Sequence, residues 1–299
     1  LAEAVRSGRL RFVEGSILSP GQVADAMRGV ELVFHLAVQC VRRSLGNPIE
    51  SHDVNAGGTL NVLEAARREG GRRFVYCSSS EVYGNGSDGL LTEETAACRP
   101  VTVYGAAKLA GELYADAYRQ TYGLDTLVVR PFNAYGPRAP ERGTRAEVIP
   151  RFLIRALNGL PPVIFGDGTN GRDFTYVTEV ARGLLLAGLP ERPAGALGGV
   201  PVNIAYGRMV TIHEVAQAVL RATGRNDLTA TLHRGRPGDV YRLHADTRRA
   251  ERLLGYKPSI PFEDGVRRYV DWFTARHPDA RALLEDEVEN WSMPPGDAR

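Results

Sequence analysis

The stretch AGGTLNVLEAARREGGRRFVYCSSSEVYG, residues 56–84, decides the fold of this chain. Residues Ala56–Glu69 form a predicted helix, and Phe74–Ser78 is a short apolar run without alternation. Such a run is typical of a strand that is buried on both faces of a parallel sheet. The helix, the strand and the polar residues that follow therefore predict one unit of an α/β fold, with a site where the strand ends.

The same alternation extends to both sides of this stretch. Strands are predicted at Leu10–Val13, Glu31–Leu36 and Thr126–Arg130, and helices at Gly21–Met27 and Tyr104–Tyr122. Strands and helices in this order imply right-handed βαβ crossovers. The prediction is an α/β protein with a doubly wound parallel sheet of the Rossmann type, incomplete at its amino-terminal side.

The second half of the chain follows a looser pattern. Thr211 and Glu214 form a predicted capping box at a helix start. We expect residues 1–145 to form the Rossmann part, 146–280 mainly a smaller α/β lobe, and 281–299 a frayed tail. The elements predicted here are helices at Val148–Asn158, Glu179–Gly188, Ile212–Thr223, Thr247–Leu254 and Asp264–Arg276, and strands at Val163–Phe165, Val202–Ile204 and Thr229–His233.

Composition excludes several classes of protein. The 299 residues are 43% hydrophobic and 24% charged, and the net charge of +2 gives no overall attraction to nucleic acid or to an anionic membrane. No apolar run approaches the ~18 residues of a transmembrane helix. The three cysteines, Cys40, Cys77 and Cys98, lack the spacing of metal ligands. We therefore predict no metal site and expect reduced thiols in a cytoplasmic protein.

The pair Tyr104 and Lys108 carries the strongest chemical signal. Four residues apart on a helix, the two side chains lie on one face about one turn apart. A nearby ammonium favours the phenolate form of a tyrosine, and a phenolate can take the proton of a substrate hydroxyl. The pair alone is a weak signal, because a surface helix can carry both residues by chance.

Polar motifs at other predicted strand ends give the pair its context. His35-Leu-Ala37 ends one strand, Ser78-Ser-Ser-Glu-Val-Tyr-Gly84 the next, and Arg130-Pro-Phe-Asn-Ala-Tyr-Gly-Pro137 a third. Gly166-Asp-Gly168 and Arg172-Asp-Phe174 follow in the second half. The carboxyl ends of parallel strands are where open α/β sheets place their sites. We interpret His35 itself as structural.

Together these motifs resemble the extended short-chain dehydrogenase/reductase family, in its nucleotide-sugar epimerase and dehydratase branch. The resemblance rests on six motifs in the same order and covers almost the whole chain. It implies an NAD-dependent enzyme that acts on a nucleotide-diphosphate sugar, preferably a UDP-sugar, through a 4-keto intermediate. It also implies a homodimer, in which the helices at 56–69 and 104–122 pair across a two-fold axis.

The resemblance assigns roles to individual residues. Tyr104 becomes the acid/base, Lys108 lowers its pKa and holds the nicotinamide ribose, and Ser79 bonds the C4 hydroxyl. The catalytic set is completed by Ser80 and Glu81. The implied cofactor-binding residues are Ser16, Ile17, Leu36, Ala37, Asn55, Ser78, Tyr104, Lys108 and Pro131. The implied substrate-binding residues are Ser79, Asn133, Val148, Phe165, Arg172, Arg236 and Asp239, with the two arginines on the diphosphate.

Two departures from the family pattern concern the cofactor. The family opens with a strand and G-x-x-G-x-x-G at a helix start, which binds the pyrophosphate, and the 299 residues contain no such run. The acidic residue for the adenosine ribose is also absent, and Ser16 follows Gly15 where the family usually has Asp. We expect these 299 residues to be a fragment or a shortened product that binds NAD poorly.

Two features point to different reactions. Ser80-Glu81 looks like the pair in mannose 4,6-dehydratases and glucuronate decarboxylases, and Glu81 could act as a base for C5. Arg236-Pro-Gly-Asp-Val240, followed by Ala245-Asp-Thr247, looks like uridine-nucleotide 4-epimerases. The longer match favours a 4-epimerase, with a 4,6-dehydratase or UDP-glucuronate decarboxylase as the alternative. A non-catalytic relative that binds a nucleotide sugar is the third hypothesis.

Overall fold

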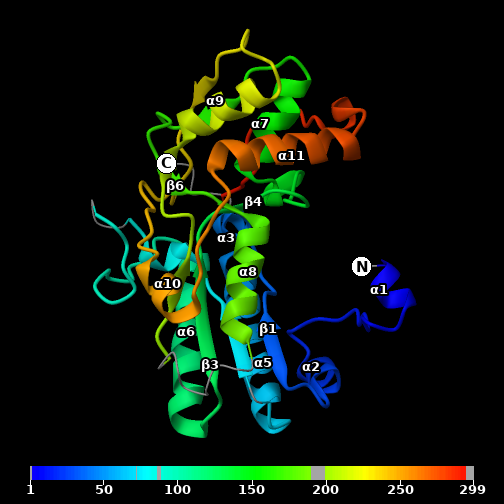
Figure 1. Cartoon of the computed structure of the whole chain (residues 1–299), viewed down its shortest axis with the longest axis vertical. Helices are drawn as coiled ribbons and strands as arrows, with labels where there is room; N and C mark the ends of the chain where they lie inside the picture. Colours follow the sequence, from blue (N-terminus) through cyan, green and yellow to red (C-terminus); the bar gives the residue numbers. More distant parts are fainter. Residues whose placement is uncertain (1, 72, 86–88, 190–198, 294–299) are drawn as a thin grey trace.

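A four-stranded parallel sheet forms the centre of the larger part of the molecule (Figure 1). The computed structural model describes residues 2–71, 73–85, 89–189 and 199–293. The strand order is β1 (Leu32–His35), β2 (Arg73–Cys77), β3 (Thr126–Pro131) and β8 (Val202–Ile204), and every pair is parallel. The predicted α/β fold with a parallel, Rossmann-type sheet is confirmed.

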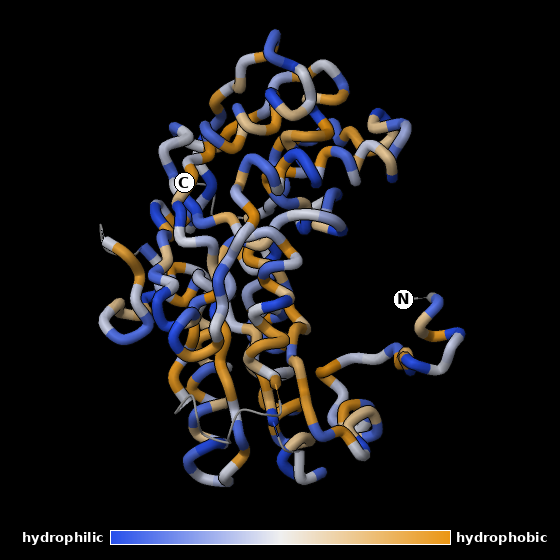
Figure 2. The backbone as a smooth tube through the Cα atoms, viewed as in Figure 1, coloured by the Kyte–Doolittle hydropathy of each residue, from blue (hydrophilic) through white to orange (hydrophobic). Residues whose placement is uncertain are grey.

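Helices cover both faces of this sheet. Phe74, Tyr76 and Val128 pack against α2 (Pro20–Met27), α5 (Gly58–Arg68) and α6 (Val103–Tyr122). The alternate residues, Val75 and Val129 among them, pack against α8 (Val177–Gly188) and α10 (Arg248–Leu254). Apolar side chains therefore occupy both faces, and Figure 2 shows the orange, apolar segments concentrated along the strands and the helices beside them.

A second, smaller part contains three helices that share one core. These are α7 (Val148–Leu157), α9 (Ile212–Ala222) and α11 (Phe262–Arg276), which lie together at the top of Figure 1. The predicted capping box is present at the start of α9, where Glu214 and Thr211 bond each other's backbone N–H. Three short pairs of strands join this part to the sheet: β4 (Ala134–Tyr135) with β7 (Thr175–Tyr176), β5 (Val163–Phe165) with β10 (Thr231–His233), and β6 (Gly171–Asp173) with β9 (Met209–Thr211).

The second half of the chain contributes to both parts. α8, β8 and α10 belong to the layers of the central sheet, although they fall within residues 146–280. Short helices that were not predicted follow β1 and β2: α3 (Val41–Gly46), α4 (Pro48–His52), the π-helix Asp53–Gly57 and the 3-10 helix Ser80–Tyr83. The boundary near residue 146 stays a prediction.

The prediction of a strand at Leu10–Val13 is wrong. Residues 9–16 have no regular structure, and the side chains of Phe12 and Val13 are 74% and 50% exposed. A strand needs a neighbour for its hydrogen bonds, and in the described part of the chain β1 pairs with β2 alone. This segment and α1 (Ala2–Arg6) extend away from the sheet as an arm (Figure 1).

The tail is more ordered than predicted. The 3-10 helix Ala280–Leu283 is followed by a segment in which the Asn290 side chain is buried and donates to the Ala146 carbonyl at 2.9 Å. The ring of Trp291 lies edge-on to Phe165, with 4.6 Å between centroids. Residues 294–299 lie outside the described residues. No helix in the described ranges is long and apolar enough to cross a membrane.

Candidate active site at the strand ends

A cavity of about 560 Å³ lies at the carboxyl ends of β2 and β3 and receives residues from both parts of the molecule. Ser79 and Tyr104 line it from the sheet side, and Phe165 and Arg172 line it from the smaller part. The structure thus brings together fourteen of the predicted site residues: Leu36, Ser78, Ser79, Ser80, Glu81, Tyr104, Lys108, Pro131, Asn133, Val148, Phe165, Arg172, Arg236 and Asp239.

Four predicted cofactor residues do not line this cavity. The exposed Ser16 and the half-buried Ile17 lie near α5, where Asn61 donates to the Ile17 carbonyl at 2.9 Å. Asn55 is buried and bonds the backbone of Gln39 in both directions, so it shapes the loop after β1. Ala37 is exposed on that loop. Their roles toward a cofactor stay predictions.

The 3-10 helix after β2 brings Ser79 and Tyr104 together. Ser79 caps this helix by accepting the Glu81 N–H at 3.2 Å. Gly105 lets α6 dock against it, because a Cβ there would lie only 2.8 Å from the Glu81 carbonyl oxygen. The first turn of α6 therefore places the Tyr104 side chain in hydrogen-bonding contact with Ser79.

The predicted effect of Lys108 on the pKa of Tyr104 stays a prediction. The Lys108 ammonium donates to the Cys77 carbonyl at 2.8 Å and lies 5.1 Å from the centre of the Tyr76 ring. Burial raises the pKa of the Tyr104 phenol above its usual value, and the Ser79 hydrogen bond opposes that rise. Burial also lowers the pKa of Lys108. The ammonium is thus held by a hydrogen bond to the end of β2.

Glu81 brings a carboxyl group into the same cavity. Burial raises its pKa, while the positive charges of Arg172 and Arg236 oppose the rise. A carboxyl group with a raised pKa gains and loses a proton closer to neutral pH, which suits it to proton transfer. His35, in contrast, is buried away from the cavity lining, and burial together with the Lys108 charge lowers its pKa to about 4.

Two guanidinium groups share one carboxylate at the cavity. Asp239 accepts from Arg172 at 2.8 Å and from Arg236 at 2.6 Å. Asn170 donates to the second oxygen of Asp239 at 2.9 Å. We call Arg172, Arg236 and Asp239 the cavity cluster. Its two positive charges against one negative charge leave a surplus that suits an anionic ligand such as a diphosphate.

Two side chains in the cavity have buried atoms without a hydrogen-bond partner among the described residues. They are Oδ1 of Asn133 and Nη1 of Arg151. Buried polar atoms are normally bonded, so each is a candidate contact for a ligand. Sequence reasoning missed Arg151, and only its place in the first turns of a helix that begins with Val148 could have indicated it.

The lining residues fit one half of a dinucleotide. Lys108 uses one of three N–H donors on Cys77, and Leu36 and Pro131 offer apolar surface beside it. This combination fits a nicotinamide ribose, whereas the sequence lacks the glycine run for the pyrophosphate. Gly166-Asp-Gly168-Thr-Asn-Gly171 has G-x-G-x-x-G spacing, but it leads into β6 and supplies no helix N-terminus.

Comparisons with known proteins identify the family of this chain. Residues 2–205 match the model of the NAD dependent epimerase/dehydratase family. The chain is 35% identical to UDP-glucose 4-epimerase of Mycolicibacterium smegmatis, covering 91% of this chain and 86% of that protein. A structure of a dTDP-glucose 4,6-dehydratase from Streptomyces venezuelae with NAD bound has a TM-score of 0.84 and 32% identity, covering 95% of this chain and 85% of that one.

UDP-glucose 4-epimerase of Thermotoga maritima, solved with UDP-glucose, has a TM-score of 0.82 and 32% identity, covering 89% of this chain and 84% of that one. The similar proteins thus include both nucleotide-sugar epimerases and nucleotide-sugar dehydratases. The chain belongs to the NAD dependent epimerase/dehydratase family, whose members are enzymes that act on nucleotide sugars.

Proposed function

We propose that this protein is a nucleotide-sugar 4-epimerase that acts on a UDP-sugar. The observation that carries the proposal is a single cavity that contains both the bonded pair Ser79–Tyr104 and the cavity cluster. The first can exchange a proton with a sugar hydroxyl, and the second can hold a diphosphate. Asn133 lines the same cavity and would contact the sugar in this proposal.

Tyr104 transfers the proton in this proposal. As phenolate it takes the proton of the C4 hydroxyl, and as phenol it returns a proton to the oxygen of the 4-keto sugar. NAD, when bound, accepts hydride from C4 and gives it back. Ser79 bonds the same oxygen and keeps it within reach of Tyr104. Since burial raises the pKa of Tyr104, the step in which Tyr104 takes the proton of the C4 hydroxyl is expected to become faster as pH rises.

Epimerisation also requires that either face of the C4 ketone can be turned toward the hydride donor. In this proposal the cavity cluster holds the diphosphate while the sugar turns about it. Val148 and Phe165 give apolar surface on the smaller part, where we place the nucleobase. The preference for uracil rests on the match of Arg236-Pro-Gly-Asp-Val240 to uridine-nucleotide epimerases.

A second candidate function rests on Glu81. Its buried carboxyl group lines the cavity with a raised pKa. Once a 4-keto sugar has formed, such a group can remove the C5 proton as the C6 hydroxyl leaves as water, and return of the hydride to C6 with a proton to C5 would complete a 4,6-dehydration. A uronate could instead lose CO₂, because the same ketone stabilises the resulting carbanion.

Product analysis separates the candidates. We would incubate the protein with excess NAD and, in turn, UDP-glucose, UDP-N-acetylglucosamine, UDP-glucuronate and GDP-mannose. The proposal expects a product of unchanged mass with inverted C4. Loss of water or CO₂ would refute it in favour of the Glu81 chemistry, and Glu81→Gln should abolish that chemistry while sparing epimerisation. Binding of the nucleotide sugars without turnover would favour the non-catalytic alternative.

We also propose a homodimer, formed through α5 and α6. Leu60 and Leu113 are 38% and 64% exposed on these helices, and Ala117 is exposed beside them. Leu63 is excluded from this surface, because it is fully buried against the sheet. Light scattering should give twice the chain mass, and Leu113→Asp should give the monomer mass. The three free cysteines support a cytoplasmic location.

A further inference from the structure

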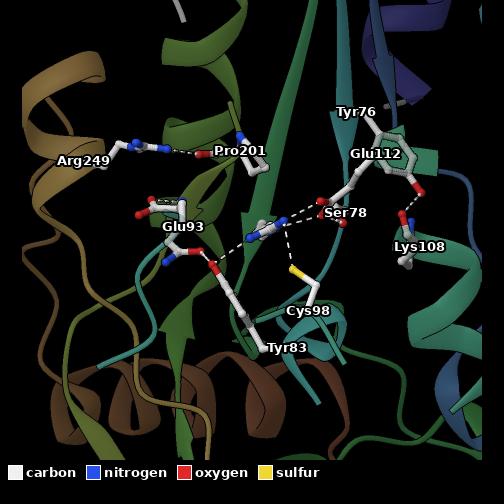
Figure 3. Close-up of polar contacts among 11 residues, drawn as sticks. Tyr76, Ser78, Tyr83, Glu93, Cys98, Lys108, Glu112, Pro201 and Arg249 are labelled. Atoms are coloured by element: carbon white, nitrogen blue, oxygen red, sulfur yellow. Dashed lines mark hydrogen bonds and ion pairs between the residues drawn. The ribbon is translucent and has the colours of Figure 1, made fainter. Parts of the chain in front are cut away.

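A buried polar network lies directly beneath the active site (Figure 3). At its centre, Arg130 of β3 donates to both oxygens of Glu112 of α6, at 2.9 and 2.6 Å. The two side chains are only 4% and 6% exposed. Removing two charges from water costs as much as their attraction returns, so an apolar pair of similar size would stabilise the fold equally well. Stability alone therefore does not explain why a charged pair occupies this buried position.

Glu112 is one of three α6 residues that hold the end of β2. Lys108 donates to the carbonyl of Cys77, Glu112 accepts from the hydroxyl of Ser78, and Tyr104 lies beside the hydroxyl of Ser79. Successive residues of the strand end are thus tied to three turns of one helix. Gly111 allows this close approach of α6 to β2, since a Cβ there would lie 2.2 Å from the hydroxyl oxygen of Tyr76.

The far side of the network is anchored in the rest of the sheet. Arg130 also donates to the Tyr83 hydroxyl at 2.9 Å, and that hydroxyl donates to Asn203 of β8 at 2.8 Å. Asn203 donates in turn to the Leu91 carbonyl at 2.9 Å. Arg130 therefore cannot turn away from Glu112 without breaking contacts to two further elements. Figure 3 shows Ser78 beside Glu112, with Tyr83 farther from both.

We propose that Glu112 is a positioning residue that acts through Ser78. Its carboxylate, held by Arg130, keeps Cys77–Ser79 in register with α6, so that Ser79 remains bonded to Tyr104. Proton transfer is sensitive to such displacements, because about 1 Å of misplacement can cost ~100-fold in rate. The inference rests on the proposed role of Tyr104 in proton transfer, but not on the choice between epimerisation and dehydration.

A matched pair of variants separates positioning from stability. Ser78→Ala and Tyr83→Phe each remove one buried hydroxyl from the network and leave the Arg130–Glu112 pair intact. Ser78→Ala breaks the link between Glu112 and the end of β2, whereas Tyr83→Phe breaks links at the last residue of the 3-10 helix and leaves the end of β2 tied to Glu112. Both variants are therefore expected to lower the melting temperature to a similar extent. Ser78→Thr keeps the hydroxyl and serves as the rescue variant.

Two measurements on the full chain then test whether Glu112 has a positioning role or only a structural one. Hydrogen exchange followed by mass spectrometry should show a larger increase in the exchange of residues 78–82 in Ser78→Ala than in Tyr83→Phe. Turnover with excess NAD and the best nucleotide sugar should fall about 10- to 100-fold in kcat for Ser78→Ala. The pKa read from the pH dependence of kcat should rise in that variant, because the Ser79 bond that lowers the pKa of Tyr104 is weakened. Ser78→Thr should recover both.

Other outcomes overturn the inference. Equal exchange and equal kcat in Ser78→Ala and Tyr83→Phe would reduce Glu112 to a structural residue. An effect of Ser78→Ala confined to the KM for NAD would make Ser78 a direct cofactor contact instead. If the wild-type protein turns over none of the sugars, the proposed function fails, and unchanged exchange of residues 78–82 in Ser78→Ala still refutes the positioning role separately.

Discussion

Two groups of arginine and carboxylate side chains, the Arg130–Glu112 pair and the cavity cluster, have different proposed roles. In the Arg130–Glu112 pair, one guanidinium meets one carboxylate, and every neighbour is protein. In the cavity cluster, Arg172 and Arg236 share Asp239 and border open space. The difference shows that residue type does not determine the role. A balanced, closed pair fixes the backbone, whereas a cluster with surplus charge and an open side can receive an anion.

The largest effect on kcat is expected at Tyr104. In the proposal, the Arg130–Glu112 pair positions this residue and the cavity cluster holds its substrate. Tyr104→Phe should lower kcat by about 10²–10⁴-fold, because it removes the group that exchanges the proton. The affinity for UDP-sugar, measured by calorimetry, should stay within a few-fold of wild type, since the cavity cluster is intact. Full activity in the phenylalanine variant would mean that neither cluster is arranged around Tyr104.

Breaking the closed pair should mainly reduce stability. Glu112→Ala leaves the Arg130 guanidinium buried and unpaired, and the free energy of unfolding is expected to fall by about 3–5 kcal/mol. Urea denaturation followed by circular dichroism measures this loss. If the change were below about 1 kcal/mol, the pair would not be a buried one in solution.

Breaking the open cluster should mainly reduce binding. Arg236→Met removes a charge-assisted bond to the diphosphate, worth about 1.5–3 kcal/mol, so the Kd for UDP should rise roughly 10- to 100-fold. Its melting temperature should change little, because Asp239 keeps Arg172 and Asn170 as partners. Arg208→Met, which breaks an exposed ion pair with Glu263, is the matched control and should leave UDP binding unchanged. Equal binding by both variants would remove the diphosphate role.

The smallest effect concerns the titration of Glu81. Burial raises its pKa above that of an unfolded chain, so the native state keeps this proton longer as pH rises. The contribution to stability is full below the ordinary glutamate pKa and is lost as pH rises through the raised value. Protonation also removes a negative charge beside Arg172 and Arg236, so UDP should bind a few-fold more tightly at the acid end of that range. Glu81→Gln should bind UDP with no such pH dependence.

The fold and most of the site could be predicted from local patterns. Apolar runs at β2 and β3 and the polar motifs after them place Ser79, Asn133 and Tyr104 at one edge of a sheet, because parallel strands end together. The predicted strand at Leu10–Val13 failed for a physical reason. An apolar run indicates what can pair, but pairing depends on a neighbouring strand that the pattern itself does not reveal.

Contacts between distant segments could not be predicted. Lys108 reaches back to the Cys77 carbonyl, which depends on how closely α6 approaches β2. Arg151 enters the cavity from α7, and the ordered tail places Asn290 beside it. Each of these depends on packing between elements that are remote in sequence, and single-chain periodicity carries no information on such packing.

In the proposed reaction the 4-keto sugar returns to a C4 hydroxyl and goes no further. The most direct test is to incubate the protein with NAD and UDP-glucose in D₂O and to analyse the sugar product by NMR and mass spectrometry. We expect UDP-galactose with no deuterium bonded to carbon, because the hydrogen of C4 is retained and C5 is never deprotonated. Deuterium at C5, or a product that has lost water, would contradict it and would assign the chemistry to Glu81.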